Sequence, residues 1–324
     1  MAVIFHISVF VLSAFVIWFF AGLLVDTVTR VAHRVHRSNF GVAFFALGIL
    51  TSLSELSVAV NATIDRVPDV SAGNLMGASL VIALLIVPVL AIAGGGIEIR
   101  HTLSLRRLAL VFGVILAPGA FLLDGGVSRG EGAAMVLLYG LLVWFIRSAS
   151  FNGTFQAIKS GLAEERGRLA ADVGKLLIGA LAIFFAGHWL VKEAVYFADA
   201  LRVPGSLIGL LVLSIGTNVP EIVVAARAVM KRHKEIAFGD YIGSAAANTL
   251  IFGGLAIANG PFTLGAREFL PTFALLAVGL ALLYGFSRSN RFISRREGYV
   301  LLVLYAAFFA LQAGNILGRG APGM

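Results

Sequence analysis

The stretch LGILTSLSELSVAVNATIDR, residues 47–66, decides the fold, because the chain repeats it as LSIGTNVPEIVVAARAVMKR at residues 213–232. At a fixed offset of 166 residues and without gaps, eleven of the 40 positions between 47 and 86 are identical in the two copies. Each copy carries one glutamate within a largely apolar run, Glu55 in the first and Glu221 in the second. A repeat at a fixed offset predicts a structure built from two related halves.

The composition places both copies in a membrane. Of the 324 residues, 59% are hydrophobic and 13% are charged, whereas soluble domains carry about 25% charged residues. Apolar blocks such as residues 2–25 reach the roughly 20 residues that a helix needs to cross a bilayer. The absence of cysteine excludes disulfide scaffolds and thiolate metal sites. We therefore expect an all-α polytopic membrane protein.

The apolar blocks predict ten transmembrane helices in a single membrane domain, residues 1–324. Their expected ranges are 3–25, 40–63, 73–95, 108–123, 132–150, 174–192, 206–228, 240–259, 268–286 and 298–317. Five spans separate equivalent helices of the two copies, and an odd number reverses the orientation. The fold class is therefore expected to be two inverted five-helix repeats. We place the first repeat at residues 1–150, a cytoplasmic connector at 151–173 and the second repeat at 174–324.

The distribution of basic residues predicts the orientation. Of 25 Lys and Arg residues, 19 fall in one set of alternate loops and six in the other. The side with more basic residues faces the cytoplasm, which puts both termini outside a plasma (inner) membrane. This topology also explains the net charge of +8, so we expect the lipid bilayer, and no nucleic acid, as a partner.

Glu55 and Glu221 are the acidic residues that we expect well inside predicted spans. Carboxylates in hydrocarbon are costly and mark ion pathways or proton relays. No predicted span offers a Lys or Arg in its mid-section as a countercharge. Thr51 and Thr217 precede the glutamates by four residues and so lie on the same helix face. The pattern predicts inorganic cations or protons as partners, and two carboxylates would neutralise one divalent ion.

Three other polar residues have simpler interpretations. Asn74 and Asp240 occupy equivalent expected helix starts, where a capping role is favoured. Asn248, inside the eighth span, is either a cation ligand or an interhelical hydrogen-bonding residue. The six histidines show no metal-ligand spacing, so solvated or interfacial roles are expected.

The motifs around the glutamates resemble the sodium/calcium exchanger family of the cation/calcium antiporter superfamily, in its prokaryotic ten-helix form. SIGTNVPE at 214–221 and GDYIGSAAAN at 239–248 are similar to the family signatures GTSLPE and GN-x-x-GS-x-x-x-N/D. The first copy, LTSLSE at 50–55, is a weaker match. The resemblance implies exchange of calcium for sodium, or for protons in related branches, at a central site formed by spans two, three, seven and eight. It implies no cofactor apart from the transported ions.

The resemblance also implies a set of cation-binding residues in this chain. Glu55 and Glu221 match calcium-coordinating glutamates, Thr51 and Thr217 match backbone-carbonyl ligands, Ser52 matches a sodium-site hydroxyl, Asn218 stands where the family has Ser, and Ser244 and Asn248 match polar ligands of span eight. In span three, Ala78 and Ile82 replace the family's Ser and Asn. The sodium sites have thus lost oxygen ligands.

The leading hypothesis is a secondary-active cation antiporter that works by alternating access at the two glutamates. A proton-coupled calcium or cation exchanger is the alternative within transport. A membrane protein that keeps the exchanger fold without transporting is a third possibility. We do not expect an enzyme, because neither a nucleophile–base pair nor a cluster of metal ligands accompanies the glutamates.

Overall fold

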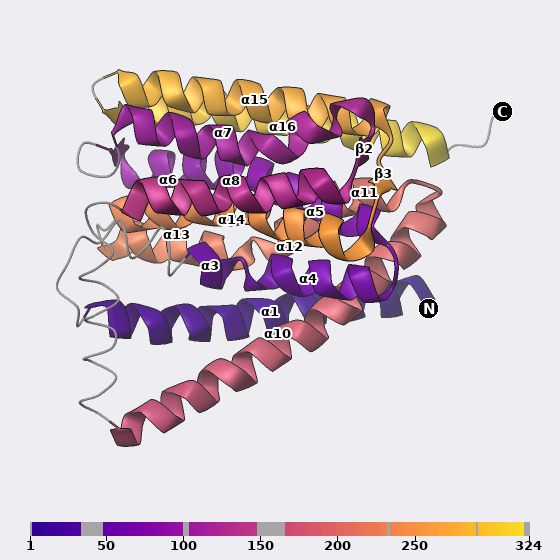
Figure 1. The fold of residues 1–324 in the computed structure, drawn as a ribbon, viewed down its shortest axis with the longest axis horizontal. Helices are drawn as coiled ribbons and strands as arrows, with labels where there is room; N and C mark the ends of the chain where they lie inside the picture. Colours follow the sequence, from indigo (N-terminus) through magenta and orange to yellow (C-terminus); the bar gives the residue numbers. More distant parts are fainter. Residues whose placement is uncertain are drawn as a thin grey trace.

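The computed structural model describes residues 2–33, 48–99, 104–147, 166–231, 234–289 and 291–320, and within them the chain is a bundle of helices (Figure 1). The elements of the first half are α1 (Ala2–His33), α3 (Gly48–Thr51), α4 (Leu53–Ile64), α5 (Pro68–Val81), η2 (Ile82–Ile86), α6 (Val87–Gly94), β1 (Ile97–Glu98), α7 (Leu105–Phe121), η3 (Leu122–Asp124), β2 (Gly126–Val127) and α8 (Arg129–Arg147). Those of the second half are α10 (Arg166–Leu201), α11 (Gly205–Ile208), η4 (Gly209–Leu213), α12 (Ser214–Thr217), α13 (Val219–Lys231), α14 (Lys234–Asn259), β3 (Phe262–Thr263), α15 (Ala266–Arg288), β4 (Phe292–Ile293) and α16 (Arg295–Gly320).

The all-α membrane fold is confirmed. In the described part of the chain, nine helices or continuous runs of helices are long and apolar enough to cross a membrane. They correspond to nine of the ten predicted spans. The predicted second span is represented by the broken helix α3–α4, and its residues 40–47 lie outside the described residues. The start of α1 and the end of α16 lie at the same end of the bundle (Figure 1), as an even number of crossings requires.

Several helices extend beyond their predicted ranges. The α5 helix begins at Pro68, a residue well suited to a first helical turn, and α14 begins at Lys234. The α10 helix begins at Arg166, inside the predicted connector, of which residues 151–165 lie outside the described residues. The apolar length of a span marks only the part in hydrocarbon, whereas a helix satisfies its own backbone in water as well.

Two short strand pairs reveal the inverted relation of the halves. β1 pairs with β4, aligning Ile97 with Ile293, and β2 pairs with β3, aligning Val127 with Phe262. The offset of 166 residues carries Ile97 to Thr263 and Val127 to Ile293, so each pair joins the two halves and the offset exchanges the pairs. The β2–β3 pair lies at one end of the bundle, and α6, which leads into β1, ends at the other (Figure 1). Equivalent parts therefore occupy opposite ends.

The same offset relates the starts of α8 and α16. The backbone amide of Ser128 donates to the Glu131 carboxylate at 2.8 Å, and that of Ser294 donates to Glu297 at 2.6 Å. In return, the amide of each glutamate lies 3.3 Å from the hydroxyl oxygen of its serine. These reciprocal capping boxes satisfy amides that lack intrahelical partners. The repeat is therefore structural well beyond residues 47–86.

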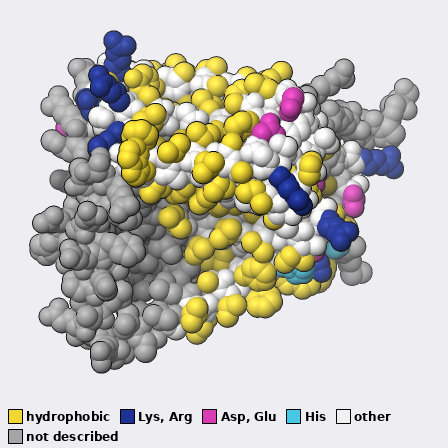
Figure 2. All heavy atoms as spheres, viewed as in Figure 1, with side chains coloured by type: hydrophobic (Ala, Val, Ile, Leu, Met, Phe, Trp, Pro, Cys, Tyr) yellow, Lys and Arg dark blue, Asp and Glu magenta, His cyan; other side chains and the backbone are white. Residues whose placement is uncertain are grey.

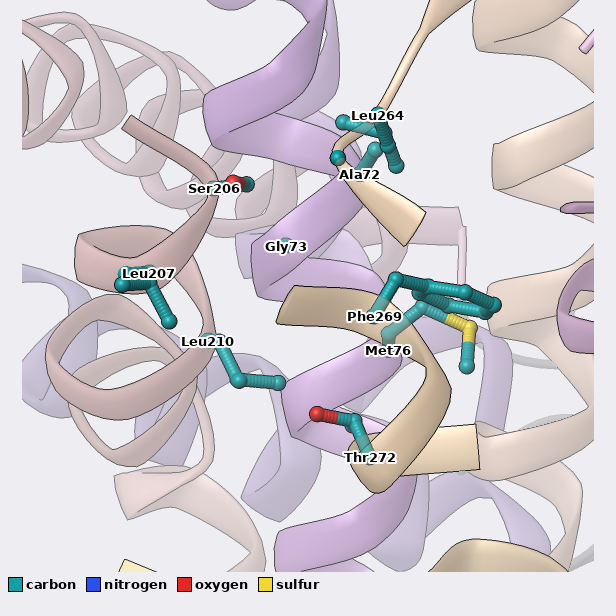
Figure 3. Close-up of a pocket in the computed structure, with 10 residues that line it drawn as sticks. Ala72, Gly73, Met76, Ser206, Leu207, Leu210, Leu264, Phe269 and Thr272 are labelled. Carbon is teal, nitrogen blue, oxygen red and sulfur yellow. The ribbon is translucent and has the colours of Figure 1, made fainter. Parts of the chain in front are cut away.

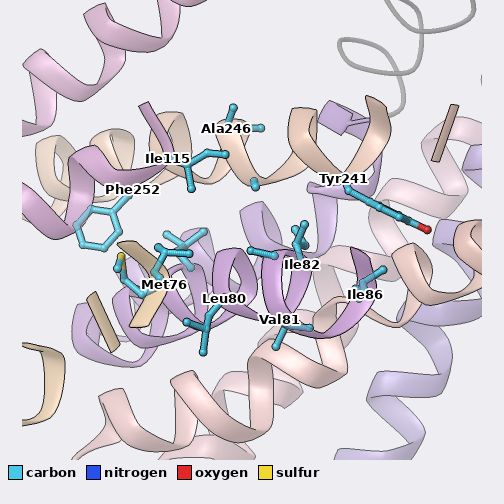
Figure 4. Packing of buried hydrophobic residues seen from close by; sticks show 14 of the residues in the cluster. Met76, Leu80, Val81, Ile82, Ile86, Ile115, Tyr241, Ala246 and Phe252 are labelled. Carbon is cyan, nitrogen blue, oxygen red and sulfur yellow. The ribbon is translucent and has the colours of Figure 1, made fainter. Parts of the chain in front are cut away.

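The distribution of side chains fits a lipid environment. Apolar side chains cover the middle of the drawn face, and charged groups gather toward the ends of the bundle (Figure 2). Outer helices expose large apolar residues, such as Leu137 (67%) and Trp144 (63%) of α8. The bundle interior is also apolar, with Leu80, Ile82, Tyr241 and Phe252 buried along α5, η2 and α14 (Figure 4).

Glycines allow α5 to approach α11 and η4 closely. A Cβ on Gly73 would overlap the backbone carbonyl of Ser206, and one on Gly209 would overlap that of Val70. Small residues at helix contacts in membranes allow this kind of backbone approach. Figure 3 shows Gly73 and Ser206 beside a cavity of about 20 Å³, whose lining includes Met76, Leu210 and Thr272. Packing thus explains the need for glycine at both positions.

Candidate functional site

Both glutamates sit directly after a break in a membrane-buried helix. The first break is at Ser52 (φ −73°, ψ 3°), between α3 and α4, and the second is at Asn218 (φ −89°, ψ 8°), between α12 and α13. The two break residues are equivalent at the 166-residue offset. Glu55 and Glu221 therefore lie in the first turns of α4 and α13, where a helix dipole stabilises negative charge. Pro220 also lies in the first turn, where its missing amide costs little.

Glu55 connects the broken helix of the first half to that of the second. The carboxyl group is fully buried, and its Oε2 accepts a hydrogen bond from the Ser54 hydroxyl at 2.8 Å. The Ser54 hydroxyl oxygen also lies 3.1 Å from the backbone carbonyl oxygen of Thr217, at the α12–α13 break. Oε1 of Glu55 has no hydrogen-bond partner among the described protein atoms. That oxygen is available to a ligand.

Glu221 makes the corresponding connection in the other direction. Its Oε1 accepts a hydrogen bond from the Ser244 hydroxyl of α14 at 3.2 Å, and Ser244 Oγ lies 2.9 Å from Ser52 Oγ at the α3–α4 break. The Tyr241 hydroxyl donates to the backbone carbonyl of Glu221 at 3.1 Å. Oε2 of Glu221 lacks a partner among the described protein atoms. Each glutamate therefore has one anchored and one free oxygen.

The two threonines reach across to the opposite repeat. The Thr51 hydroxyl donates to Asp240 Oδ1 at 3.2 Å, and the Thr217 hydroxyl donates to Asn74 Oδ1, also at 3.2 Å. Asn74 and Asp240 are fully buried in the interiors of α5 and α14. The expected capping roles are therefore wrong, because both helices begin earlier than the sequence indicates. Asp240 is also a third fully buried acidic residue, beside Glu55 and Glu221, which corrects the expectation that only the two glutamates lie well inside spans.

The two asparagines complete the polar surroundings. Asn218 donates from Nδ2 to the Ser214 carbonyl at 2.7 Å, and Asn248 donates from Nδ2 to Ser79 Oγ at 3.4 Å. Asn248 thus forms the interhelical bond considered above, while Oδ1 of each asparagine lacks a described protein partner. Both proposed ligand oxygens therefore remain available.

The two span-three departures from the family pattern lie inside the bundle. Ala78 and Ile82 are buried and bring no side-chain oxygen to the centre of the bundle. Ser79, the residue after Ala78, supplies the hydroxyl that meets Asn248. Span three therefore retains one polar contact with span eight, one position away from the expected one.

All eight residues expected in the site are buried, each with at most 2% exposure: Thr51, Ser52, Glu55, Thr217, Asn218, Glu221, Ser244 and Asn248. Sequence reasoning did not assign Ser54, Asn74, Ser79 and Asp240 to the site. The signal for Asn74 and Asp240 is their equivalence at the repeat offset, and Ser54 is adjacent to Glu55. Ser79 has no comparable signal, because its repeat equivalent is Ala245.

The geometry suits a hard cation bound by few charges and several neutral oxygens. Glu221 interacts electrostatically with both Glu55 and Asp240. Among the described residues, no three His, Asp or Glu side chains converge on one point in a way that could hold a metal. Calcium and similar ions take six to eight oxygens, including carbonyl, amide and hydroxyl oxygens. Two carboxylates and the oxygens of serine, threonine and asparagine are the kinds of ligand that such an ion takes.

Two histidines near one end of the bundle hold helices together. His6 Nδ1 lies 2.7 Å from Glu193 Oε2, and its ring stacks on Tyr196 at 3.5 Å between centroids. His188 Nδ1 lies 3.9 Å from Asp65 Oδ2. The first pair joins α1 to α10, and the second joins α10 to the end of α4. Neither histidine lies at the glutamates, in agreement with the expected interfacial roles.

Inverted repeats whose broken helices meet at a buried polar centre are typical of secondary transporters. The fold and the site thus define the class of protein as a membrane transport protein. Comparisons with known proteins give the family. The family model for sodium/calcium exchanger proteins matches residues 5–147 and 172–314, one match in each half. The chain belongs to the sodium/calcium exchanger family, a family of ion transporters rather than enzymes.

Individual relatives agree with this assignment. The chain is 26% identical to the sodium/calcium exchanger MaX1 of Methanosarcina acetivorans, in an alignment that covers 89% of this chain and 92% of MaX1. It is 29% identical to the inner membrane protein YrbG of Escherichia coli, over 67% of this chain and 70% of YrbG. The fold is similar to that of the sodium-calcium exchanger NCX_Mj soaked with 10 mM Na⁺ and no Ca²⁺, with a TM-score of 0.69 and 22% identity over 95% of this chain and 99% of that one.

Proposed function

We propose that this chain is a secondary-active antiporter that exchanges calcium for sodium across the inner membrane. Transport would occur by alternating access at the centre of the bundle, with Glu55 and Glu221 as the charged calcium ligands. Thr51, Ser52, Thr217, Asn218, Ser244 and Asn248 would contribute neutral oxygens. The repeats 1–150 and 174–324 would form this site between them.

The observation that carries the proposal is the state of the two glutamates. Both are fully buried, each is held by a serine through one carboxylate oxygen, and each leaves the other oxygen without a protein partner. A buried carboxylate without a countercharge is costly. A divalent ion between two such groups removes that cost, and the contacts leave one oxygen of each carboxylate for it.

The relatives support the choice of ions. MaX1 is named as a sodium/calcium exchanger, and NCX_Mj is described as a sodium-calcium exchanger soaked with Na⁺ together with Sr²⁺ or Ca²⁺. Both helix breaks lie within the residues that match the family. Calcium as substrate and sodium as coupling ion are therefore the first choice for this chain.

Calcium flux in proteoliposomes tests the proposal. Purified protein is reconstituted, and ⁴⁵Ca²⁺ uptake is measured with an outward sodium gradient, with an outward proton gradient, and with neither. We expect uptake that depends on the sodium gradient and requires both glutamates. Absence of gradient-driven calcium uptake under both conditions, from protein that is folded and monodisperse, would refute antiport of calcium.

Proton coupling is the second candidate, favoured by the span-three departures. Because Ala78 and Ile82 provide no side-chain oxygen, a sodium ion at this place would have fewer ligands than the family pattern supplies. A proton needs one oxygen rather than a shell of oxygens, so it tolerates this loss. Uptake driven by the proton gradient alone would select this candidate.

A further inference from the structure

The third fully buried carboxylate, Asp240, is not used by the proposed calcium site. Its side chain is fully buried in α14, Oδ1 accepts a hydrogen bond from Thr51 at 3.2 Å, and Oδ2 lacks a protein partner. Among the described residues, no ion pair involves Asp240. A fully buried carboxyl group in this state either holds a proton or needs a cation close to it.

The inverted repeat shows that this charge is a specific feature of one half. The equivalent residue in the first half is Asn74, whose Oδ1 accepts a hydrogen bond from the Thr217 hydroxyl at the same distance, 3.2 Å. The neutral amide therefore fulfils the structural part of the role, the hydrogen bond to the threonine. The carboxylate in the second half adds a negative charge that the fold itself does not need.

Asp240 does not form one joint site with the two glutamates. No three carboxylates converge on a common point among the described residues, although Asp240 interacts electrostatically with Glu221. The Thr51 hydroxyl and Oδ2 of Asp240 lie at the contact of α3 with α14, where Gly48 packs against the backbone of Gly243. An ion held there would be a separate one, near the calcium site.

We propose that Asp240, together with Thr51, forms a second binding site for one monovalent alkali cation, beside the two-glutamate calcium site. This inference rests on the proposed calcium antiport. The second site lets bound cations neutralise the three carboxylates both with and without calcium. With calcium bound, the three carboxylates are neutralised by one divalent and one monovalent ion. Without calcium, three monovalent ions neutralise the same three groups.

The test removes the calcium site and asks whether a sodium site remains. In the double variant Glu55→Gln/Glu221→Gln, equilibrium binding of ²²Na⁺ to purified protein in detergent at alkaline pH should saturate at one ion per chain. Adding Asp240→Asn should abolish the saturable binding. Because both glutamates are already absent, this result does not depend on whether they bind calcium in the wild-type protein, and failure here is distinguishable from failure of the calcium assay.

A second variant guards against loss of folding. Adding Asn74→Asp to the triple variant moves the carboxylate to the equivalent position in the first half, opposite Thr217, and should restore one saturable ²²Na⁺ site. Asp124→Asn, which changes an acidic residue that caps an exposed turn, is the matched control in the double variant and should leave binding unchanged. Absence of saturable ²²Na⁺ binding in the double variant, as for a carboxyl group that holds a proton, would overturn the proposal. Binding that survives Asp240→Asn would overturn it too.

Discussion

Glu55→Gln is the most direct test of the calcium site, because it changes one charge and almost no volume. Glu55 is fully buried, and no Lys or Arg pairs with it among the described residues. A glutamine at this position can still accept the hydrogen bond that the Ser54 hydroxyl donates to Oε2 at 2.8 Å. The local fold should therefore survive, and the loss should fall on the bound ion.

The magnitude follows from the charge. A divalent ion that keeps only one of two buried carboxylates is left with an unneutralised charge, and breaking a buried charge pair costs about 3–5 kcal/mol. At about 1.4 kcal/mol per tenfold change in affinity, calcium should bind more than about a hundredfold more weakly. Glu221→Gln should behave alike, because Glu221 is equally buried and supplies the other of the two charges.

Calcium binding is measured by isothermal titration, and ⁴⁵Ca²⁺ flux is measured in proteoliposomes, after size-exclusion chromatography confirms a monodisperse protein. Asp240→Asn is the matched control, since it also removes a buried carboxylate charge but leaves both proposed calcium ligands, and its effect on calcium affinity should be smaller. Near wild-type calcium affinity in one glutamate variant would remove that residue from the site. Near wild-type affinity in both would refute the two-glutamate reasoning.

Three further predictions concern topology, coupling and helix packing. A cysteine introduced by Lys159→Cys, outside the described residues, should be labelled from the cytoplasmic side only, because the basic loops face inward; labelling from outside intact cells would reverse the orientation. Calcium flux should depend more weakly on sodium than in a full-motif exchanger, and Ala78→Ser with Ile82→Asn should strengthen the dependence by restoring oxygen ligands; unchanged sodium dependence would contradict this. His6→Phe should keep a ring against Tyr196 but leave Glu193 buried without its partner, lowering stability by about 1.5–3 kcal/mol. A thermal unfolding midpoint no lower than that of the wild type would refute the last prediction, and adding Glu193→Gln should recover part of the loss.

The sequence by itself determined the membrane class, the inverted repeat and the central glutamates. Hydrocarbon tolerates only helices with satisfied backbones, so apolar length alone predicts where the chain crosses. A buried carboxylate such as Glu55 stands out because little else in its span is charged. The equivalence of Ser52 and Asn218 likewise followed from the offset, although their role as helix breaks did not.

Only the tertiary structure decided which polar residues meet. Asn74 and Asp240 read as helix caps, since the apolar pattern ends near them, but their helices begin earlier, at Pro68 and Lys234, and leave both side chains in the bundle interior. The contact of Thr51 with Asp240 joins residues 189 positions apart, and no local pattern encodes such a distance. The ends of a helix depend on its backbone hydrogen bonds. The contacts between polar residues depend on how the two halves pack. The periodicity of a single span predicts neither.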